Sequence, residues 1–406
     1  MINVIGLGYI GLPTALMLAK SGLNIVGTDI NKSLIRSLKK GELNFEEKGL
    51  ERLFNIAIKN KIKFSEEYQK TDVYIIAVPT PYLSDSKKID AKYVISAIES
   101  ILEVCLFNSI IIIESTISPG TINKYIKPKI QESGFSIGND IHLVHAPERI
   151  IPGNMIYELE YNSRTIGADS IDIAEKVKAI YSTFCKGEIV MTDIKSAEMS
   201  KVVENTYRDI NIAFANELAI ICRQDKLNVY EIIRIANKHP RVNILNPGPG
   251  VGGHCISVDP WFLVGDYPDL TKLILTARKI NDSMPDFVIS RIKYIMGQNN
   301  IDSLSQVGLY GLTYKENVDD TRESPTLQLL KILENHFSCD INVYDPYIKE
   351  NIINNQYHDF EKFIRNIRIL VVMVGHNHLL ENVNLIKNKI ILDTRNVIKE
   401  FSTYKL

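Results

Sequence analysis

Short apolar runs alternate with amphipathic stretches along most of the chain. The first, INVIG, predicts a strand, and the helical pattern after it ends near Gly22. Further runs of strand length are NIVGTD, VYIIAV (73–78), SIIIIE (109–114), IHLVH (141–145) and RTIG (164–167). Strands that alternate with helices in this way predict a doubly wound parallel sheet.

A long helix and a second alternating region follow. The stretch from about Ser196 to Asp225 contains no glycine or proline and predicts one helix. Strand-like runs return in QVGLYGL (306–312), INVYD (341–345), ILVVMV (369–374) and IILD (390–393). We therefore predict an α/β protein with two Rossmann-like doubly wound domains joined by a long-helix central domain. The expected boundaries are 1–194, 195–298 and 299–406.

Composition narrows the class of protein. The chain has 406 residues, is 45% hydrophobic and carries a formal net charge of −1, so no general attraction to nucleic acid or an anionic membrane is expected. No apolar run reaches the roughly 18 residues of a membrane span, and the first residues do not resemble a signal peptide, so a cytoplasmic location is expected. Five scattered cysteines without a CxxC pair predict neither a disulfide framework nor a metal site.

The first strand leads into a glycine-rich turn with the spacing of a dinucleotide site. Gly6, Gly8 and Gly11 form GxGxxG between a strand and a helix, and Asp29 ends the next strand. These glycines would allow a tight turn, close approach of a pyrophosphate and close helix packing. An acidic residue at Asp29 would bind ribose hydroxyls, which favours NAD over NADP. The alternative is a turn without nucleotide, in which Asp29 caps the strand.

Polar residues also end later strands of the predicted sheet. They lie in Pro79-Thr80-Pro81, Glu114-Ser115-Thr116 and Ala146-Pro147-Glu148-Arg149. Ligands bind at this edge of doubly wound sheets. For Thr80 and Thr116, simple turn formation is as good an interpretation as ligand binding.

The loop GPGVGGHCISVDP (248–260) places a single cysteine among glycines. Hydride transfer alone oxidises an alcohol to an aldehyde, whereas a thiolate at Cys255 would let the oxidation continue to an acid through a thiohemiacetal and a thioester. The glycines would let substrate approach the sulfur, and His254 would support the thiolate or shape the loop. The alternative is a glycine-rich turn with an incidental cysteine.

Three polar residues share one face of the predicted long helix. Lys201, Asn205 and Arg208 are spaced i, i+4 and i+7. Lys201 could assist proton transfer or stabilise an oxyanion, and Asn205 could hold a water or hydroxyl. Without other information, a solvated helix face is the simpler interpretation.

Taken together, the motifs resemble the UDP-glucose/GDP-mannose dehydrogenase family over nearly the whole chain. They are GLGYIGLP, PTP, ESTISPGT, APERIIPG, EMSKVVENTYRD, NKHPRVNI, PGPGVGGHCISVDP, GLTYKENVDDTRESP and DTRN, in this order. APERIIPG, HPRVN and GGHC are most similar to family members that oxidise UDP-N-acetyl-D-mannosamine at C6 to the uronic acid used in surface polysaccharides.

The resemblance implies an NAD domain, a dimer-forming central domain and a C-terminal domain for the UDP-sugar. It implies Cys255 as nucleophile, Lys201 as proton donor or acceptor, and catalytic functions for Glu148, Asn205 and Asp259. Implied NAD contacts, besides the glycines, are Tyr9, Ile10, Asp29, Thr80, Thr116 and Arg322. Implied substrate contacts are Arg149, Ile150, Lys201, Asn205, Arg208, His239, Arg241, Gly252, Tyr314, Lys315 and Arg395, with Arg241 reaching a partner subunit's site.

One position departs from the family pattern. UDP-glucose dehydrogenases commonly have a second glutamate four residues after the first, where this chain has Pro152. This weakens UDP-glucose as substrate and leaves UDP-N-acetylglucosamine as the nearer alternative. A non-catalytic sugar-nucleotide-binding protein is the alternative from a different class, since a fold does not fix an activity.

Overall fold

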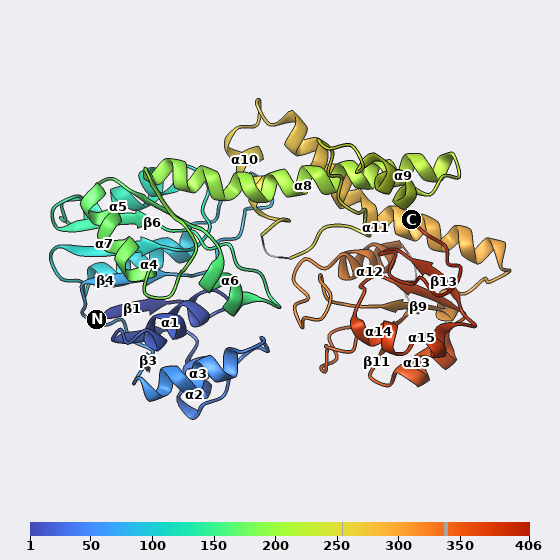
Figure 1. Ribbon diagram of the computed structural model, residues 1–406, viewed down its shortest axis with the longest axis horizontal. Coiled ribbons are helices and arrows are strands. Elements are labelled where there is room, and N and C mark those ends of the chain that lie inside the picture. The colour runs from blue at the N-terminus through green and yellow to red at the C-terminus, as the bar shows by residue number, and fades with distance from the viewer. Residues whose placement is uncertain (254, 337–339) are drawn as a thin grey trace. The chain divides into compact units, whose positions relative to one another are not determined.

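The computed structural model describes residues 1–253, 255–336 and 340–406. The chain divides into two compact units. The first comprises Met1–Glu204 with Trp261–Tyr267, and the second comprises Asn205–Pro260 with Pro268–Leu406. Each unit contains its own β-sheet, which confirms the predicted α/β class (Figure 1).

The first unit has an eight-stranded sheet in the part of the chain that is described, in the order β3-β2-β1-β4-β5-β6-β7-β8. Its strands are β1 (Ile2–Ile5), β2 (Ile25–Thr28), β3 (Lys63–Ser65), β4 (Val73–Ile76), β5 (Ser109–Ile113), β6 (Ile141–His145), β7 (Arg164–Ala168) and β8 (Ile189–Thr192). The chain moves from β1 outward to β2 and β3, then returns to β4 on the other side of β1. The carboxyl ends of β1 and β4 therefore form a topological switch point, where ligands bind in such sheets.

Helices pack in two groups against this sheet. They are α1 (Gly11–Lys20), α2 (Lys32–Lys40), α3 (Leu50–Lys59), α4 (Lys92–Leu102), the π-helix η1 (Ile122–Ile126), α5 (Lys127–Glu132), α6 (Met155–Tyr161) and α7 (Ile171–Tyr181). α1 packs with α3 and α6, whereas α4 packs with α5 and η1. Nearly all of α1 is buried, so the turn before it is held firmly.

Strand β7 differs from the predicted parallel sheet. It is antiparallel to β6, with Val144 opposite Ala168 and His145 opposite Gly167, while β7 and β8 are parallel to each other. Apolar runs predict strands but do not encode their direction. Here the connection after β6 stays at the carboxyl edge, where Glu47 accepts hydrogen bonds from the amides of residues 153 and 155, so β7 starts at that edge.

The second unit has a parallel five-stranded sheet within the described residues, in the order β11-β10-β9-β12-β13. Its strands are β9 (Val307–Tyr310), β10 (Asn342–Tyr344), β11 (Gln356–Tyr357), β12 (Ile369–Val372) and β13 (Ile390–Asp393). Its helices include η2 (Leu304–Gln306), α12 (Pro325–His336), α13 (Phe360–Asn366), α14 (Asn377–Glu381) and α15 (Val383–Ile386). This order repeats that of the first five strands of the other sheet.

The predicted long helix is confirmed as α8 (Ile194–Gln224), which Asp193 caps by accepting a hydrogen bond from the Ser196 amide. The other central helices are α9 (Val229–Ala236), α10 (Asp259–Asp266) and α11 (Lys272–Gln298). In the second unit, apolar residues of α8, α9 and α11 share one core with β9 and β12. Among the described residues, no helix has both the length and the hydropathy that crossing a membrane requires.

Candidate active site

The glycine-rich turn after β1 has the close contacts that a dinucleotide turn requires. Gly6 has φ +86°, and a Cβ there would lie 2.7 Å from the Ala77 carbonyl oxygen. A Cβ on Gly11 would lie 1.8 Å from the Gly6 carbonyl oxygen, whereas a Cβ on Gly8 would meet no atom within 4 Å. Gly6 and Gly11 thus permit the tight turn, and Gly8 leaves space beside the backbone. This arrangement fits the pyrophosphate of NAD at the start of α1.

Asp29 both shapes this turn and keeps capacity for a ligand. Its Oδ2 accepts a hydrogen bond from the Leu7 amide at 2.8 Å, and its Oδ1 accepts one from the Asn31 amide at 2.8 Å. A carboxylate has about four lone-pair sites, so roughly two stay available for ribose hydroxyls. The two interpretations of Asp29, as a structural cap and as a ribose ligand, are therefore compatible.

Replacing Asp29 tests this double function. We expect Asp29→Ala to weaken NAD binding about 10- to 100-fold, since a hydrogen bond to a charged group contributes about 1.5–3 kcal/mol. Isothermal titration with NAD measures the change. Asp72→Ala is the control, because Asp72 is an exposed aspartate that lies just before β4 and outside the turn. An unchanged affinity in Asp29→Ala would contradict a ribose contact.

The predicted threonines at the switch point contact each other. Thr80 donates its Oγ1 hydrogen to the Thr116 carbonyl oxygen at 2.6 Å, which joins the loops after β4 and β5. Thr80 is buried and Thr116 is half-buried. Turn formation is thus observed, and NAD contact by these residues stays a prediction.

Glu148 lies in a buried charge cluster at the carboxyl ends of β5 and β6. Its Oε1 accepts a hydrogen bond from the Arg149 amide at 2.6 Å, and its Oε2 accepts one from Arg164. Arg164 also donates to Glu114 at 3.3 Å. The sequence interpretation missed Arg164, although a charged residue at the start of an apolar strand was a signal.

Arg149 and Ile150 follow Glu148 in the same loop. The Arg149 guanidinium donates to the backbone and hydroxyl oxygens of Ser163 and to the Thr165 hydroxyl, at 2.8–3.1 Å. It also forms an ion pair with Glu204 of α8 at 2.6 Å. Ile150 is buried. Arg149 is thus well anchored inside the first unit, and its contact with substrate stays a prediction.

The polar residues of α8 are not a uniformly solvated face. Lys201 and Asn205 are each 6% exposed, whereas Arg208 is exposed. Lys201 also acts on His145, which donates its Nδ1 hydrogen to the Ile113 carbonyl oxygen at 2.9 Å. Burial lowers the pKa of His145 to about 3, and the Lys201 charge adds to this effect. The simple solvated-face interpretation is therefore wrong for Lys201 and Asn205.

The cysteine loop is tied to α8 at both of its ends. The Gly248 amide donates to Asn216 Oδ1 at 2.9 Å, and Asn205 Nδ2 donates to Asp259 Oδ2 at 2.6 Å. Between these anchors Cys255 is half-buried, and its carbonyl oxygen accepts the amides of Val258 and Asp259 just before α10. His254 lies outside the described residues. The structure thus joins two predicted catalytic residues, Asn205 and Asp259, that sequence reasoning treated separately.

The loop glycines serve close packing, and the approach of substrate to the sulfur stays a prediction. A Cβ on Gly252 would lie 2.5 Å from the Glu323 carbonyl oxygen and 2.8 Å from Tyr314 Cβ. A Cβ on Gly253 would lie 2.8 Å from the Tyr314 ring, and the Gly253 amide donates to the Arg322 carbonyl oxygen at 2.9 Å. The glycines therefore let this loop lie directly on residues 314–323.

Four predicted ligands surround this contact in the second unit. Tyr314 and Lys315 are half-buried, and the Arg322 side chain pairs with Asp320 at 2.6 Å. A Cβ on Gly248 would lie 2.6 Å from Nη1 of the Arg395 guanidinium. Partial burial lowers the pKa of Arg395. The structure thus brings Tyr314, Arg322 and Arg395 together with the cysteine loop, which itself contains Gly252.

A device like that of Asp29 occurs in the second sheet. Gly311 follows β9 with φ +100°, and Asp345 follows β10. Asp345 accepts the amides of Leu312 and Tyr347, as Asp29 accepts those of Leu7 and Asn31. His376 also contacts Asp345 at 3.3 Å. The matching ends of NIVGTD and INVYD were a signal for Asp345 that sequence reasoning did not use.

His239 and Arg241 lie in an exposed turn after α9. Asn237 closes this turn by bonding to both the carbonyl oxygen and the amide of Ile244, at 2.9 and 2.7 Å. The Arg241 amide donates to His239 Nδ1 at 3.3 Å. The contact of these two residues with substrate stays a prediction.

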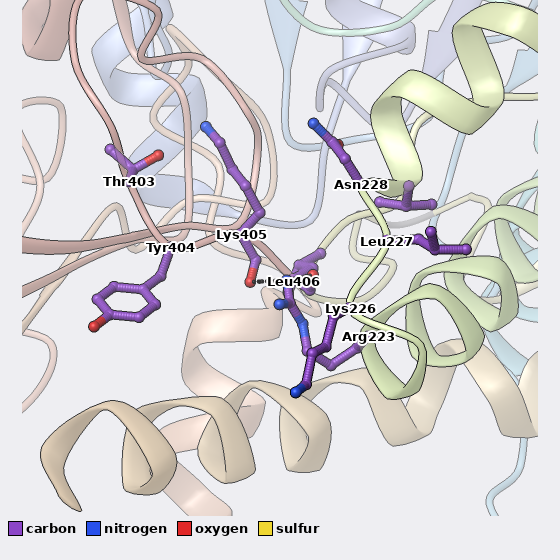
Figure 2. Close-up of a pocket in the computed structure, with 9 residues that line it drawn as sticks. Arg223, Lys226, Leu227, Asn228, Thr403, Tyr404, Lys405 and Leu406 are labelled. Atoms are coloured by element: carbon purple, nitrogen blue, oxygen red, sulfur yellow. Dashed lines mark hydrogen bonds between the residues drawn. The ribbon is translucent and has the colours of Figure 1, made fainter. Parts of the chain in front are cut away.

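A pocket of about 270 Å³ in the second unit contains none of the predicted residues. Figure 2 shows it between the end of α8 and the last residues of the chain, with the Lys226 and Lys405 side chains extending in opposite directions. Arg223 is already bonded to the carbonyl oxygens of Lys405 and Leu406. The charges do not converge on one point, so we assign this pocket no function.

Comparison with known proteins identifies the family. The chain matches three domains of the UDP-glucose/GDP-mannose dehydrogenase family: the NAD binding domain at residues 1–185, the central domain at 195–283 and the UDP binding domain at 308–400. The chain belongs to this family. It therefore has an NAD binding domain and a domain for a UDP-sugar, and the prediction of NAD as cofactor is confirmed.

Relatives of known name match along almost the whole chain. The UDP-N-acetyl-D-mannosamine dehydrogenase of Methanocaldococcus jannaschii is 44% identical over 98% of this chain and 92% of its own. The structure of the UDP-N-acetyl-mannosamine dehydrogenase Cap5O from Staphylococcus aureus is similar with a TM-score of 0.89 and 42% identity, over 100% of this chain and 98% of that one. A UDP-D-ManNAc dehydrogenase structure from Pyrococcus horikoshii matches with a TM-score of 0.91, 37% identity and the same coverage.

Proposed function

We propose that this chain is an NAD-dependent UDP-N-acetyl-D-mannosamine dehydrogenase that forms UDP-N-acetyl-D-mannosaminuronate. The observation that carries the proposal is the cysteine loop, which is anchored to α8 through Asn205 and Asp259 in a chain that has both an NAD and a UDP binding domain. The names and the full-length similarity of the relatives support the choice of sugar. The product would serve surface polysaccharide synthesis.

The reaction needs two oxidations at one carbon and one water. NAD supplies the hydride acceptor for both oxidations. Lys201 takes the proton of the C6 hydroxyl in the first oxidation, which gives an aldehyde. The Cys255 thiolate then forms a bond to the aldehyde carbon, and the resulting thiohemiacetal loses the second hydride to become a thioester. Water adds to the thioester carbon, the C–S bond breaks, and the acid and the thiolate are released.

Several polar groups support these steps. Asn205 holds the reacting oxygen, and its bond to Asp259 fixes its amide orientation. Glu148, paired with Arg164, accepts the proton of the hydrolytic water, because a carboxylate oxygen can accept a hydrogen bond and then the proton from that water. Since position 152 is proline, no second carboxylate four residues later shares this task.

Ligand binding is assigned to residues of the separate motifs. Gly6, Gly8, Tyr9, Ile10, Gly11, Asp29, Thr80, Thr116 and Arg322 would bind NAD. Arg149, Ile150, Lys201, Asn205, Arg208, His239, Arg241, Gly252, Tyr314, Lys315 and Arg395 would bind the UDP-sugar. A diphosphate carries about two negative charges, and arginine can contact it in a bidentate manner, which supports the number of cations proposed.

We also propose a homodimer with Arg241 contributed to the partner's site. Large apolar side chains on α8 support it, because Tyr207, Phe214 and Ile221 are 67%, 49% and 53% exposed. The domain boundaries at 194/195 and 298/299 are kept as part of the proposal. The cytoplasmic location stays a prediction.

A substrate panel tests the choice of sugar. Purified enzyme with NAD is given UDP-N-acetylmannosamine, UDP-N-acetylglucosamine or UDP-glucose, and kcat/KM is measured from NADH absorbance. We expect kcat/KM for UDP-N-acetylmannosamine to exceed that for the other two sugars by at least about tenfold, because one gained or lost contact with the substrate changes kcat/KM by about this factor. A higher kcat/KM for another sugar would make that sugar the substrate. Tight binding of a UDP-sugar, with no NADH formed from any of the three, would favour a non-catalytic protein.

A further inference from the structure

A buried charge cluster surrounds Arg164 in the first unit. This side chain is 3% exposed, and it lies between two buried carboxylates, those of Glu114 and Glu148, which are 0% and 3% exposed. A buried charge is tolerated where it is paired and hydrogen-bonded. The cluster lies entirely within the first unit, and the reaction described above uses only Glu148.

Sheet geometry explains why Arg164 meets Glu148. The antiparallel pairing of β6 with β7 sets His145 opposite Gly167. Continuing this register three residues further along each segment brings Glu148 opposite Arg164. Strand β7 therefore delivers the guanidinium to the carboxyl edge, which a parallel β7 would not do.

Arg164 is fixed from several directions. One guanidinium nitrogen donates to Glu148 Oε2, and another donates to Glu114 Oε1 at 3.3 Å. The guanidinium lies 4.4 Å from the ring centre of Tyr181 and 5.2 Å from that of Phe184. Such contacts hold a planar cation in one orientation.

We propose that Arg164 is a positioning residue for the hydrolytic step, which fixes the orientation of the Glu148 carboxylate and is itself held by Glu114. The inference rests on the proposed function, in which Glu148 receives the proton of the hydrolytic water. Two donors, the Arg149 amide and Arg164, occupy part of the Glu148 carboxylate. About two of its four lone-pair sites stay available for water.

Charge balance gives Glu114 a distinct function. Two carboxylates and one guanidinium leave a net negative charge, so the cluster favours one bound proton near neutral pH. Burial raises the pKa of Glu114 to about 7, against the effect of Arg164 and with the aid of Glu148. Below this pH Glu114 is neutral, and Glu148 is then the charged partner of Arg164. Above it, Arg164 is shared between two charged carboxylates.

Other groups face the cluster from neighbouring elements. Tyr181 donates its hydroxyl hydrogen to Glu114 Oε1 at 3.2 Å, and burial raises the pKa of this phenol well above its ordinary value. Thr14 also faces Glu114, and the buried Cys185 faces Arg164. His145 is paired with Ile113, the residue before Glu114, and burial lowers the pKa of His145 so that it stays neutral.

Two conservative variants test the proposal. Arg164→Lys keeps the charge but cannot bridge two carboxylates, and Glu114→Gln keeps the size but removes one charge. Arg36→Lys, an exposed residue of α2, is the matched control. Circular dichroism and NAD titration establish that each variant is folded.

The first readout is independent of activity. Carboxyl carbon NMR of the unliganded enzyme follows the Glu148 and Glu114 signals between pH 5 and pH 9. We expect the Glu148 signal in Arg164→Lys to differ from that of wild type, because the contact with the guanidinium is lost. A Glu114 titration near pH 7 should be present in wild type and absent in Glu114→Gln. A Glu148 signal that is the same in Arg164→Lys and wild type would overturn the proposal.

The second readout separates the two halves of the reaction. In single turnovers, Arg164→Lys should form the first NADH within about twofold of wild type but release uronate about 100-fold more slowly, which is the lower range for general acid–base catalysis. The enzyme thioester should then be seen by mass spectrometry. Hydrolysis in Glu114→Gln should lose the pH dependence near 7 that wild type shows.

The outcomes distinguish this inference from the proposed function. If both variants hydrolyse like wild type with an unchanged pH profile, the positioning function is wrong. If wild type forms no uronate from any sugar of the panel while the Glu148 signal changes in Arg164→Lys, the proposed function fails and the contact between Arg164 and Glu148 stands.

Discussion

Cys255→Ala is expected to abolish uronate formation, with a fall of about four orders of magnitude or more, as is found for removal of other nucleophiles. Without the sulfur, the aldehyde cannot become a thiohemiacetal, so the tetrahedral intermediate that would lose the second hydride does not form. Chromatography with mass detection of the UDP-sugar products measures the loss. Small amounts of aldehyde should still form, because the first oxidation does not need the thiol.

Two further variants sharpen this experiment. Cys255→Ser should trap an ester of the sugar on the enzyme, visible as a mass increase, because an oxygen ester hydrolyses more slowly than a thioester. Cys105→Ala is the matched control, since Cys105 is another half-buried cysteine in the described part of the chain. Uronate formation at the wild-type rate in Cys255→Ala would remove the nucleophile assignment.

Lys201→Met should lower kcat by about 10²- to 10⁴-fold, the range typical of a lost general acid or base. Methionine fills nearly the same volume in a site that is only 6% exposed, so the fold should be kept. KM should change far less than kcat. Stopped-flow absorbance of NADH measures the first oxidation directly.

The charge and the proton transfer of Lys201 can be separated. Lys201→Arg keeps the positive charge but cannot donate or accept a proton near neutral pH. We expect it to be nearly as slow as Lys201→Met, whereas recovery of most activity would show that Lys201 only stabilises an oxyanion. Lys195→Met, an exposed lysine on the same helix, is the control and should be fully active.

Much of the fold followed from local patterns. The alternation of apolar runs predicted both sheets, and the stretch without glycine or proline predicted α8. The direction of β7 was not predictable, because an apolar run such as RTIG predicts a strand but does not indicate whether it is parallel or antiparallel to its neighbour. Arg164 was missed for this reason, since only an antiparallel β7 brings it opposite Glu148.

The site was predictable as separate motifs but not as contacts. Asn205 and Asp259 are 54 positions apart, and nothing in either motif indicates that their side chains bond to each other. The loop glycines were expected to open the way to Cys255, whereas Gly252 and Gly253 allow packing on Tyr314. The spacing of residues in the sequence describes one helix, strand or loop at a time. Contacts such as these depend on how several of those elements pack together, so the spacing does not predict them.

The central claim is a four-electron oxidation through Cys255, and the stoichiometry of NADH tests it most directly. Wild-type enzyme with a limiting amount of UDP-N-acetylmannosamine and excess NAD is followed to completion, and NADH and sugar products are both counted. We predict two NADH and one UDP-N-acetylmannosaminuronate for each sugar consumed. One NADH per sugar, with the aldehyde as final product, would contradict the account.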